Sequence, residues 1–563
     1  MYRSKNCQQL EFPDFYLPFS GHLDPENRWI ALARLVPWGL AEEIYHAELC
    51  EDSGQPIVPA RVALGALLIK ERLKLTDRET VEVIQENPYL QFFIGLEEFT
   101  LDRPFDASLM VDFRKRFGEE GIQRMAEAIA LASLQAAEPI SAEPTPEGTA
   151  DDNPEPPTTA QPTINHSQES SGQESNPQQT LPESAESENA ASDDPTETPP
   201  NRGQLIADAT CAPADIRYPT DVSLLNEARE KTEEVIDALH ASRVGKAPRP
   251  RTYRVKARRA FLAFIKKKRP GNKAIRRAKK KQLGFLGRNL RAIDRLLEHP
   301  ENAQPLTPLS RRQVKNLLVV REVFRQQMEM FESRSQRVDD RIVSISQPHV
   351  RPIKRGKAGR ETEFGAKLSI SVIDGFSFVD RLSWNNYNEG TDLVEQIETY
   401  RRRFGFYPES VHVDKIYRTR ANRKFCKTHG IRMTGPPLGR PPQRVSLADK
   451  KQAATDEAIR NRVEGKFGEG KRRFGLGRVM AKLACTSTAQ ISLSFLVMNL
   501  EEALRRFFFA IIFLCQVLFP RLFARQVASI NPPCRCKTPG HNITPRPRPA
   551  FGRQNFTRWT MSD

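Results

Sequence analysis

The stretch QLIADATCAPADIRYPTD, residues 204–221, begins with a short apolar run that meets a carboxylate. Leu205, Ile206 and Ala207 predict a buried strand, with Asp208 at its end. A buried carboxylate without a partner is costly, and no Lys or Arg lies between Asp208 and Arg217 to neutralise it. Asp is also common at strand-end turns and helix N-caps. The stretch alone therefore leaves a turn residue and a functional carboxylate both open.

The charge of the chain is distributed unevenly along its length. The 563 residues carry a formal net charge of +16, but residues 138–200 hold 14 acidic residues, 12 prolines and no Lys or Arg. Without that segment the remainder carries +30. A folded part this basic indicates a polyanionic partner, most often nucleic acid. The alternative is a basic protein that is merely soluble.

Composition and hydrophobic period divide the chain into four regions. The first is predicted to be a helical domain, for which a DNA-binding helix-turn-helix and a plain helical bundle both fit. The second lacks the apolar residues needed for a core and is predicted to be a disordered acidic linker. The third has α/β character with a helical basic insertion at about 223–343, and the fourth holds the end of a C-terminal helix and a basic tail. Their bounds are 1–137, 138–202, 203–510 and 511–563.

Within the third region, several segments have clear local signals. Asp374-Gly375 lies between two alternating runs and predicts a β-hairpin turn. The strand ESVHVD ends at Asp414, and a helix is expected from about residue 455. Near the first region's centre, Thr76-x-x-Glu79 predicts a helix that starts with a capping box.

The insertion contains 20 Lys and Arg and no acidic residue between Arg243 and Ile293. Its spacing predicts helices with one apolar and one basic face. A basic face is often merely solvated, but this density without acidic counterparts favours contact with phosphates. The predicted DNA-binding residues in this region are Lys266, Lys267, Lys268 and Arg269.

The cysteines and the apolar segments argue for a cytoplasmic protein without a membrane partner. The eight cysteines form no CxxC pair, which favours free thiols in a reducing compartment. The most apolar stretch, FFFAIIFLCQVLF at 507–519, has 13 residues. Because a bilayer span needs about 20, this stretch is expected to form a core or packing helix.

Three carboxylates are candidates for one metal site. Asp414 follows the alternating run Val411–Val413 and precedes Lys415, which repeats the situation of Asp208. On a helix, Arg460, Glu464 and Lys471 fall within about 40° of one another. Mg²⁺ prefers hard oxygen ligands, and three carboxylates can hold two ions about 3.5–4 Å apart. Strands end in Asp in many folds, so the pattern alone leaves a structural role open.

These segments resemble the DDE-type insertion-sequence transposases of bacteria, with an InsH-like N-terminal domain and an RNase H-like catalytic domain. LIADATCAPADIRYPTD resembles the segment of the family's first aspartate, and VHVDKIYRTRANRKFCKTHGIR that of the second. The family's third signature is Arg, three residues, Glu, six residues and Lys, which Arg460, Glu464 and Lys471 match. That signature begins with Tyr three positions before Arg, where this chain has Glu457.

The resemblance implies a catalytic and metal-binding triad of Asp208, Asp414 and Glu464. It also implies a cofactor of two Mg²⁺ ions, for which Mn²⁺ can substitute. Arg460 and Lys471 are expected to contact DNA phosphates, and Lys415 is predicted to bind DNA as well. The fold class implied is α+β: a mixed RNase H-like sheet flanked by helices and interrupted by a helical insertion.

The implied function is cleavage at the ends of an insertion sequence and transfer of the freed 3′-hydroxyls into target DNA. The implied partners are double-stranded DNA, both the terminal inverted repeats and the target, and a second copy of the chain on that DNA at the bacterial nucleoid. Two alternatives remain: a metal-dependent nuclease without strand transfer, and a non-catalytic DNA-binding repressor derived from a transposase.

Overall fold

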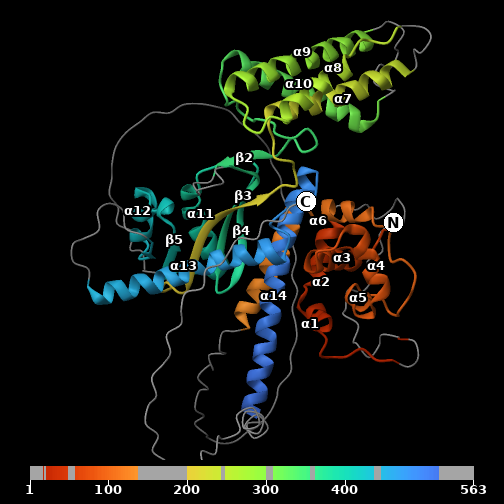
Figure 1. Cartoon of the computed structure of the whole chain (residues 1–563). Coiled ribbons are helices and arrows are strands. Elements are labelled where there is room, and N and C mark those ends of the chain that lie inside the picture. Colours follow the sequence, from red (N-terminus) through yellow and green to blue (C-terminus); the bar gives the residue numbers. More distant parts are fainter. Residues whose placement is uncertain are drawn as a thin grey trace, which may run out of the picture. The chain divides into compact units, whose positions relative to one another are not determined.

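The computed structural model describes residues 17, 21–47, 57–136, 199–241, 248–298, 309–354, 362–435 and 446–518 (Figure 1). The chain divides into two compact units, residues 1–505 and 506–563. Most of the predicted acidic linker and the whole predicted basic tail after Asn531 lie outside the described residues.

The described elements before residue 137 are helices. The capping box predicted at Thr76 is confirmed: the Thr76 hydroxyl accepts a hydrogen bond from the Glu79 amide (3.3 Å), and the Glu79 carboxylate accepts one from the Thr76 amide (2.7 Å). A kink at Gly118, where φ is 60°, divides the longest of these helices. The six helices are α1 (Arg28–Leu35), α2 (Trp38–His46), α3 (Ala60–Leu73), α4 (Asp77–Glu86), α5 (Pro88–Phe93) and α6 (Leu109–Gln135).

The second half of the first unit is built on a mixed sheet. Its strand order is β2-β3-β1-β5-β6, and β4 also pairs with β3. β1 runs antiparallel to β3 and parallel to β5, and β6 continues the parallel side. The chain therefore combines helices with a mixed sheet, as the α+β prediction requires. The strands are β1 (Gln204–Pro213), β2 (Arg351–Lys354), β3 (Thr362–Ile373), β4 (Phe376–Ser383), β5 (Ser410–Val413) and β6 (Arg432–Met433).

The prediction that the first strand ends at Asp208 is wrong, because β1 continues to Pro213. The strand persists because β3 pairs with it along the whole segment, with Asp208 opposite Ile370 and Pro213 opposite Gly365. Its pairing with β5, however, stops at Ala207. Asp208 is therefore the first residue of β1 beyond its parallel neighbour.

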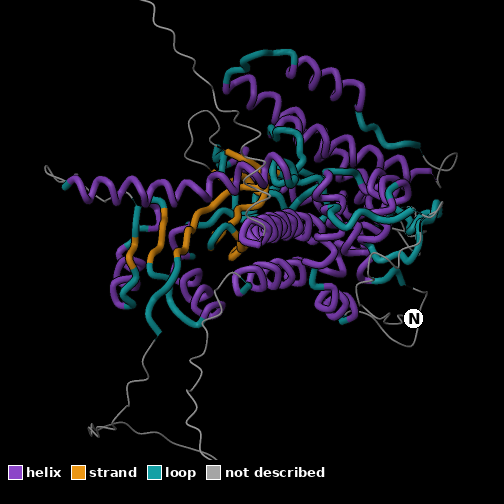
Figure 2. The backbone as a smooth tube through the Cα atoms, turned by 90° about the horizontal axis from the view of Figure 1, so that it is seen from below, coloured by secondary structure: helices purple, strands orange, loops and turns teal. Residues whose placement is uncertain are grey.

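Helices flank the sheet. α13 (Leu447–Arg473) packs against β1 and β5, and α11 (Leu393–Phe404) packs against β1 and α12 (Arg420–Thr428). Figure 2 shows helices on both sides of the row of strands. Two short 3₁₀ helices, η3 (Glu389–Thr391) and η4 (Lys415–Tyr417), lie close to each other.

The last helix, α14 (Ala484–Leu518), also joins the N-terminal helices to the sheet. The buried Asn499 side chain accepts a hydrogen bond from the Ser377 amide (2.9 Å) and donates to the carbonyl oxygens of Ser377 (3.0 Å) and Ala126 (3.3 Å). The apolar run predicted to form a core or packing helix is helical up to Leu518, where α14 ends. Its Phe509 and Phe513 side chains are exposed, so these two positions are not part of a core.

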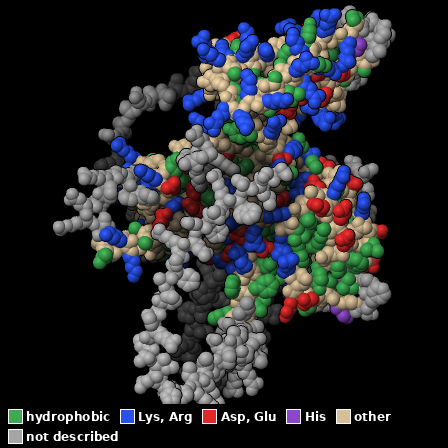
Figure 3. Space-filling model, in the orientation of Figure 1, with side chains coloured by type: hydrophobic (Ala, Val, Ile, Leu, Met, Phe, Trp, Pro, Cys, Tyr) green, Lys and Arg blue, Asp and Glu red, His purple; other side chains and the backbone are tan. Residues whose placement is uncertain are grey.

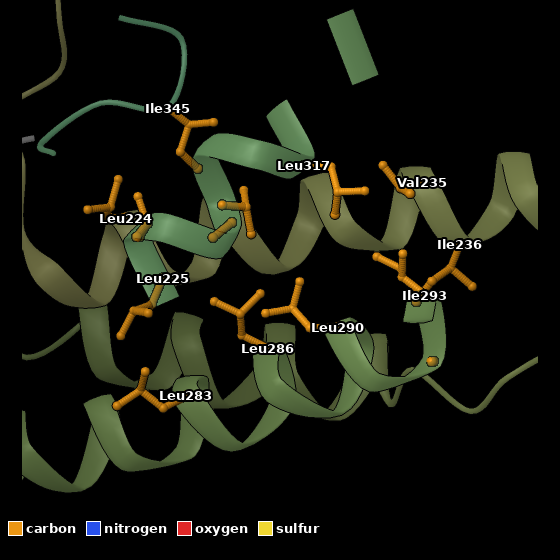
Figure 4. Close-up of a cluster of buried hydrophobic side chains, with 14 of the residues drawn as sticks. Leu224, Leu225, Val235, Ile236, Leu283, Leu286, Leu290, Ile293, Leu317 and Ile345 are labelled. Atoms are coloured by element: carbon orange, nitrogen blue, oxygen red, sulfur yellow. The ribbon is translucent and has the colours of Figure 1, made fainter. Parts of the chain in front are cut away.

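Between β1 and β2, four helices form an insertion with a core of its own. Leu225, Leu286, Ile293 and Val320 are among its fully buried residues, and Figure 4 shows how side chains of this cluster meet. Figure 3 shows Lys and Arg side chains spread over the visible surface of these helices. The helices are α7 (Asp221–Ala241), α8 (Arg254–Ile265), α9 (Asn272–Leu297) and α10 (Arg311–Glu332).

The beginning and the end of the insertion are tied together at Asp221. This carboxylate, at the start of α7, forms ion pairs with Arg341, which follows α10, and with Lys279 of α9. These positive charges hold the pKa of Asp221 below its usual value despite burial, which acts in the opposite direction. The insertion is thus closed at its base by charged contacts.

Candidate active site

A cavity of about 950 Å³ lies where the parallel strands of the sheet end. Asp208, Asp414 and Glu464 all line it, together with Arg460 and Lys471. The structure therefore brings five of the predicted site residues to one place from three separate elements. Lys415 and the basic run at 266–269 are not among the residues that line this cavity.

Asp208 reaches the cavity from within β1 and is partly buried. Its carboxylate accepts a hydrogen bond from the backbone amide of Ala209 (2.7 Å). The pKa of Asp208 is raised to about 6, chiefly by burial and also by the charges of Asp414 and Glu389, although the Ala209 amide and Arg460 act to lower it. The amide and Arg460 thus compensate the ionised form of Asp208 only in part.

Asp414 lies directly after β5, as predicted, and caps η4. Its carboxylate accepts a hydrogen bond from the Lys415 amide (2.7 Å), and the residue is exposed. Because β1 and β5 are parallel and their pairing ends at Ala207 and Val413, the two aspartates follow equivalent positions in adjacent strands. Carboxylates at this edge of parallel strands meet at one place, which explains the repulsion between Asp208 and Asp414.

Glu464 and its basic neighbours lie on α13, which begins eight residues earlier than the expected start near 455. The helix is continuous through the glycines at 465, 468 and 470, so Lys471 keeps helical spacing from Glu464. The Glu464 side chain is 63% exposed, and one oxygen lies 3.7 Å from Nη1 of Arg460. The Arg460 guanidinium also makes two hydrogen bonds to Glu457, of 2.7 and 3.2 Å.

Several residues that line the cavity were missed by the sequence analysis. Glu389 in η3 forms an ion pair with Lys367 of β3, and the Lys367 ammonium also donates to the carbonyl oxygen of Tyr387 (2.8 Å). The available signal for Lys367 was its position as the one Lys or Arg in the strand TEFGAKLSISVI.

Tyr417 is the last residue of η4, the short helix that Asp414 caps, and it is fully buried. Its hydroxyl has no hydrogen-bond partner among the described residues. Burial raises the pKa of Tyr417, and the charges of Asp208 and Glu389 raise it further, so the phenol stays neutral. Tyr417 is therefore a buried, neutral group near the aspartates and is not among the residues that line the cavity.

Two parts of the chain match known families. Residues 411–501 match the family described as "Transposase DDE domain", and residues 18–116 match "Transposase domain (DUF772)". The resemblance to DDE transposases is confirmed. The first match includes Asp414, Glu464 and Lys471.

A curated relative of this DDE transposase-like chain is the uncharacterized protein ORF8 in the nfe locus of Rhizobium meliloti. It is 35% identical over 113 residues, which cover 20% of this chain and 54% of that protein. The chain thus spans about half the length of this curated relative. No solved structure matches the chain.

The DDE family uses divalent metal ions, so its members need oxygen ligands that can hold such an ion. Among the described residues, no group of three or more His, Cys, Asp or Glu side chains is close enough to hold a metal ion. The donors nevertheless fit a hard divalent cation, because all three are carboxylates and Asp208 and Asp414 repel each other where they meet. Glu464 lines the same cavity, with one carboxylate oxygen 3.7 Å from Nη1 of Arg460.

None of the helices in the described part of the chain has the length and apolar character that a bilayer-spanning segment requires.

Proposed function

We propose that the chain is an insertion-sequence transposase that binds the ends of its element, cleaves them and transfers their 3′-hydroxyls into target DNA. The observation that carries this proposal is the convergence of Asp208, Asp414 and Glu464 on one cavity with Arg460 and Lys471. The matches to two transposase families support it. The strand order and directions support an RNase H-like fold: on one side of β1 lies the antiparallel β3, with which β2 and β4 pair, and on the other side lie the parallel strands β5 and β6.

In this proposal Asp208, Asp414 and Glu464 hold two Mg²⁺ ions, or Mn²⁺ in their place. When bound, the ions supply positive charge against the reacting phosphate and promote ionisation of the attacking hydroxyl. The partial burial of Asp208 favours binding of a cation in the cavity, because the cation offsets the free-energy cost of the desolvated carboxylate charge. Arg460 and Lys471 hold backbone phosphates near the cut, because their cationic groups line the same cavity.

The other DNA contacts belong to the surface around the cavity and to the insertion. Lys415, exposed at η4, is positioned next to Asp414 for a phosphate contact outside the cavity. Lys266 caps the C-terminal end of α8, which ends at Ile265, and the exposed Lys267, Lys268 and Arg269 follow before α9. These side chains give the insertion a sequence-independent affinity for duplex DNA. The working assembly is a homodimer on DNA at the bacterial nucleoid.

The experiment that tests the proposal is the substitution Asp414→Asn. The variant keeps the shape of the side chain and the oxygen that accepts from the Lys415 amide, but it removes the charge that holds a cation. Cleavage of labelled element ends in Mg²⁺ should fall to background, while duplex affinity stays equal or rises slightly. The same result is expected for Asp208→Asn and Glu464→Gln, whereas Lys471→Ala should keep residual activity.

A matched control is Asp449→Asn, which changes an exposed carboxylate of α13 that is not among the cavity-lining residues. This variant should cleave like wild type. If Asp414→Asn also cleaves at nearly the wild-type rate while folded and bound, Asp414 is a turn residue only. Cleavage without strand-transfer product would identify a nuclease, and wild-type DNA binding without cleavage would identify a repressor.

A further inference from the structure

Arg460 lies in the wall between two cavities. The larger is the candidate active site, and the smaller, of about 310 Å³, is lined by Arg418, Arg432 and Glu457 among others. Glu457 lines only the smaller cavity and Glu464 only the larger, while Arg460 lines both. One guanidinium is therefore shared by two carboxylates, one turn before it and one turn after it on α13.

The two carboxylates do not hold Arg460 equally. Nε and Nη2 of Arg460 donate to the two oxygens of Glu457, at 3.2 and 2.7 Å, and Nη2 also donates to the Asn461 side chain at 3.0 Å. The closest contact to Glu464 is the 3.7 Å separation from Nη1. The Arg460 side chain is 15% exposed, so its choice of partners is restricted.

Part of the Arg460 guanidinium remains available to a ligand. An arginine has five N–H groups in a fixed fork. The Nε–Nη2 edge, which grips a phosphate through two parallel hydrogen bonds, is engaged by Glu457. Among the described residues, Nη1 has no hydrogen-bond partner and faces the side of Glu464. Arg460 thus offers a phosphate in the active-site cavity a single-sided contact.

We propose that Glu457 is an intramolecular competitor of the DNA phosphate for Arg460. Its carboxylate occupies the bidentate edge of the guanidinium and keeps the affinity of the site for duplex DNA below what Arg460 alone would give. This inference rests on the proposed function, in which Arg460 binds a DNA phosphate. It makes Glu457 a positioning residue, because it acts on DNA through Arg460.

The charge and exposure of the pair fit a competitor better than a structural contact. The hydrogen bonds from Arg460 lower the pKa of Glu457, so it is ionised at neutral pH. The Glu457 side chain is 48% exposed, and exposed ion pairs contribute little to folding. Removing this carboxylate should therefore leave the fold intact and release the edge of Arg460 for a phosphate.

The test is duplex-DNA affinity of the full-length Glu457→Gln variant, measured by fluorescence anisotropy in EDTA across a salt series. Chelation prevents cleavage, so binding is read separately from activity. We expect a three- to tenfold lower Kd and a slope of log K against log salt that is steeper by about 0.9, the value for one added phosphate contact.

The matched control is Glu322→Gln on α10. Glu322 makes the same bidentate contact with an arginine three residues later, Arg325, at 2.7 and 2.9 Å. Glu322→Gln therefore measures how duplex-DNA affinity changes when one negative charge is removed from an Arg–Glu pair that lies outside the two cavities. The gain at Glu457 should exceed this control and should disappear in an Arg460→Ala background.

Three results would overturn the inference: no gain in affinity, a gain equal to that of Glu322→Gln, or a gain that persists without Arg460. If wild type binds duplex DNA and Glu457→Gln binds no tighter, the inference fails and the proposed function stands. If the wild-type chain does not bind duplex DNA, the proposed function fails and the inference fails with it.

Discussion

Replacement of Asp208 by Asn is expected to stabilise the metal-free protein at neutral pH. The pKa of Asp208 is raised from the ordinary 3.8 to about 6, chiefly by burial. At 1.36 kcal/mol per pKa unit, the ionised carboxylate costs the folded state about 3 kcal/mol above pH 6. Asn carries no charge, and its side-chain oxygen can still accept from the Ala209 amide. The substitution therefore removes the cost and keeps the local hydrogen bond.

The effect has a defined pH window. Below pH 3.8 Asp208 is protonated in both the folded and the unfolded state, so it contributes no pH dependence. Between pH 3.8 and about 6 the unfolded state releases its proton first, and wild-type stability falls as the pH rises. The advantage of Asp208→Asn should therefore grow across this window and level off above it.

The assay is thermal unfolding in EDTA from pH 4 to 8. For a cooperative domain of 150–250 residues, about 3 kcal/mol corresponds to roughly 6–12 °C in Tm. Asp215→Asn is the control of opposite sign, because hydrogen bonds from Lys482 and Arg478 lower the pKa of Asp215. Loss of the Asp215 carboxylate should destabilise the protein at neutral pH, and the Tm difference between Asp215→Asn and wild type should shrink as the pH falls. If the Tm difference between Asp208→Asn and wild type is the same at pH 4 and pH 7.5, the ionised Asp208 carboxylate does not destabilise the fold, and the reasoning is refuted.

Three other predictions concern the DNA surface and the packing. Replacing the exposed residues Lys266, Lys267, Lys268 and Arg269 with Gln should flatten the salt dependence of duplex binding by up to roughly 3–4 in log–log slope. An unchanged slope would mean that the run is only solvated. Gly365→Ala should cost at least about 2 kcal/mol in chemical denaturation, because a Cβ there would overlap the Ala212 carbonyl group across the β1–β3 pair. Gly284→Ala in α9, where a Cβ meets nothing within 4 Å, should instead stabilise by about 0.5–1 kcal/mol. Asn499→Ala should cost about 2 kcal/mol in the same assay, since it leaves the buried Ser377 amide unpaired, and an unchanged denaturation midpoint would show that this contact is dispensable.

Features set by neighbouring residues could be predicted from the sequence. The capping box at Thr76 involves residues three positions apart. The hairpin turn at Asp374-Gly375 has positive φ at both residues, 43° and 84°, which is the conformation that this dipeptide favours. Asp414 was also placed correctly, because β5 is a short strand whose apolar residues stop where its pairing stops.

Features set by distant residues could not be predicted. The length of β1 depends on β3, which lies far along the chain and pairs with Ala209 to Pro213 although that segment is weakly apolar. The same holds for Glu389 and Lys367, which become part of the cavity only when η3 and β3 meet. Helical spacing alone allows Arg460 to pair with Glu457, three residues before it, or with Glu464, four residues after it. Only the distances in the structure, 2.7 Å to Glu457 and 3.7 Å to Glu464, show which carboxylate Arg460 binds.

The way in which the insertion joins the sheet bears on how such a chain can evolve and be engineered. β1 and β3 are antiparallel neighbours, with Pro213 opposite Gly365, and the insertion lies with β2 in the connection between these two adjacent strands. The first and last parts of the insertion meet at Asp221 and Arg341. Because the cost of closing a loop grows only slowly with its length, a single genetic event could replace this module without altering the strands that carry the carboxylates. If the insertion contacts DNA as proposed, its surface can diversify while the carboxylate site is inherited unchanged. The same junction is a suitable place to graft a foreign domain.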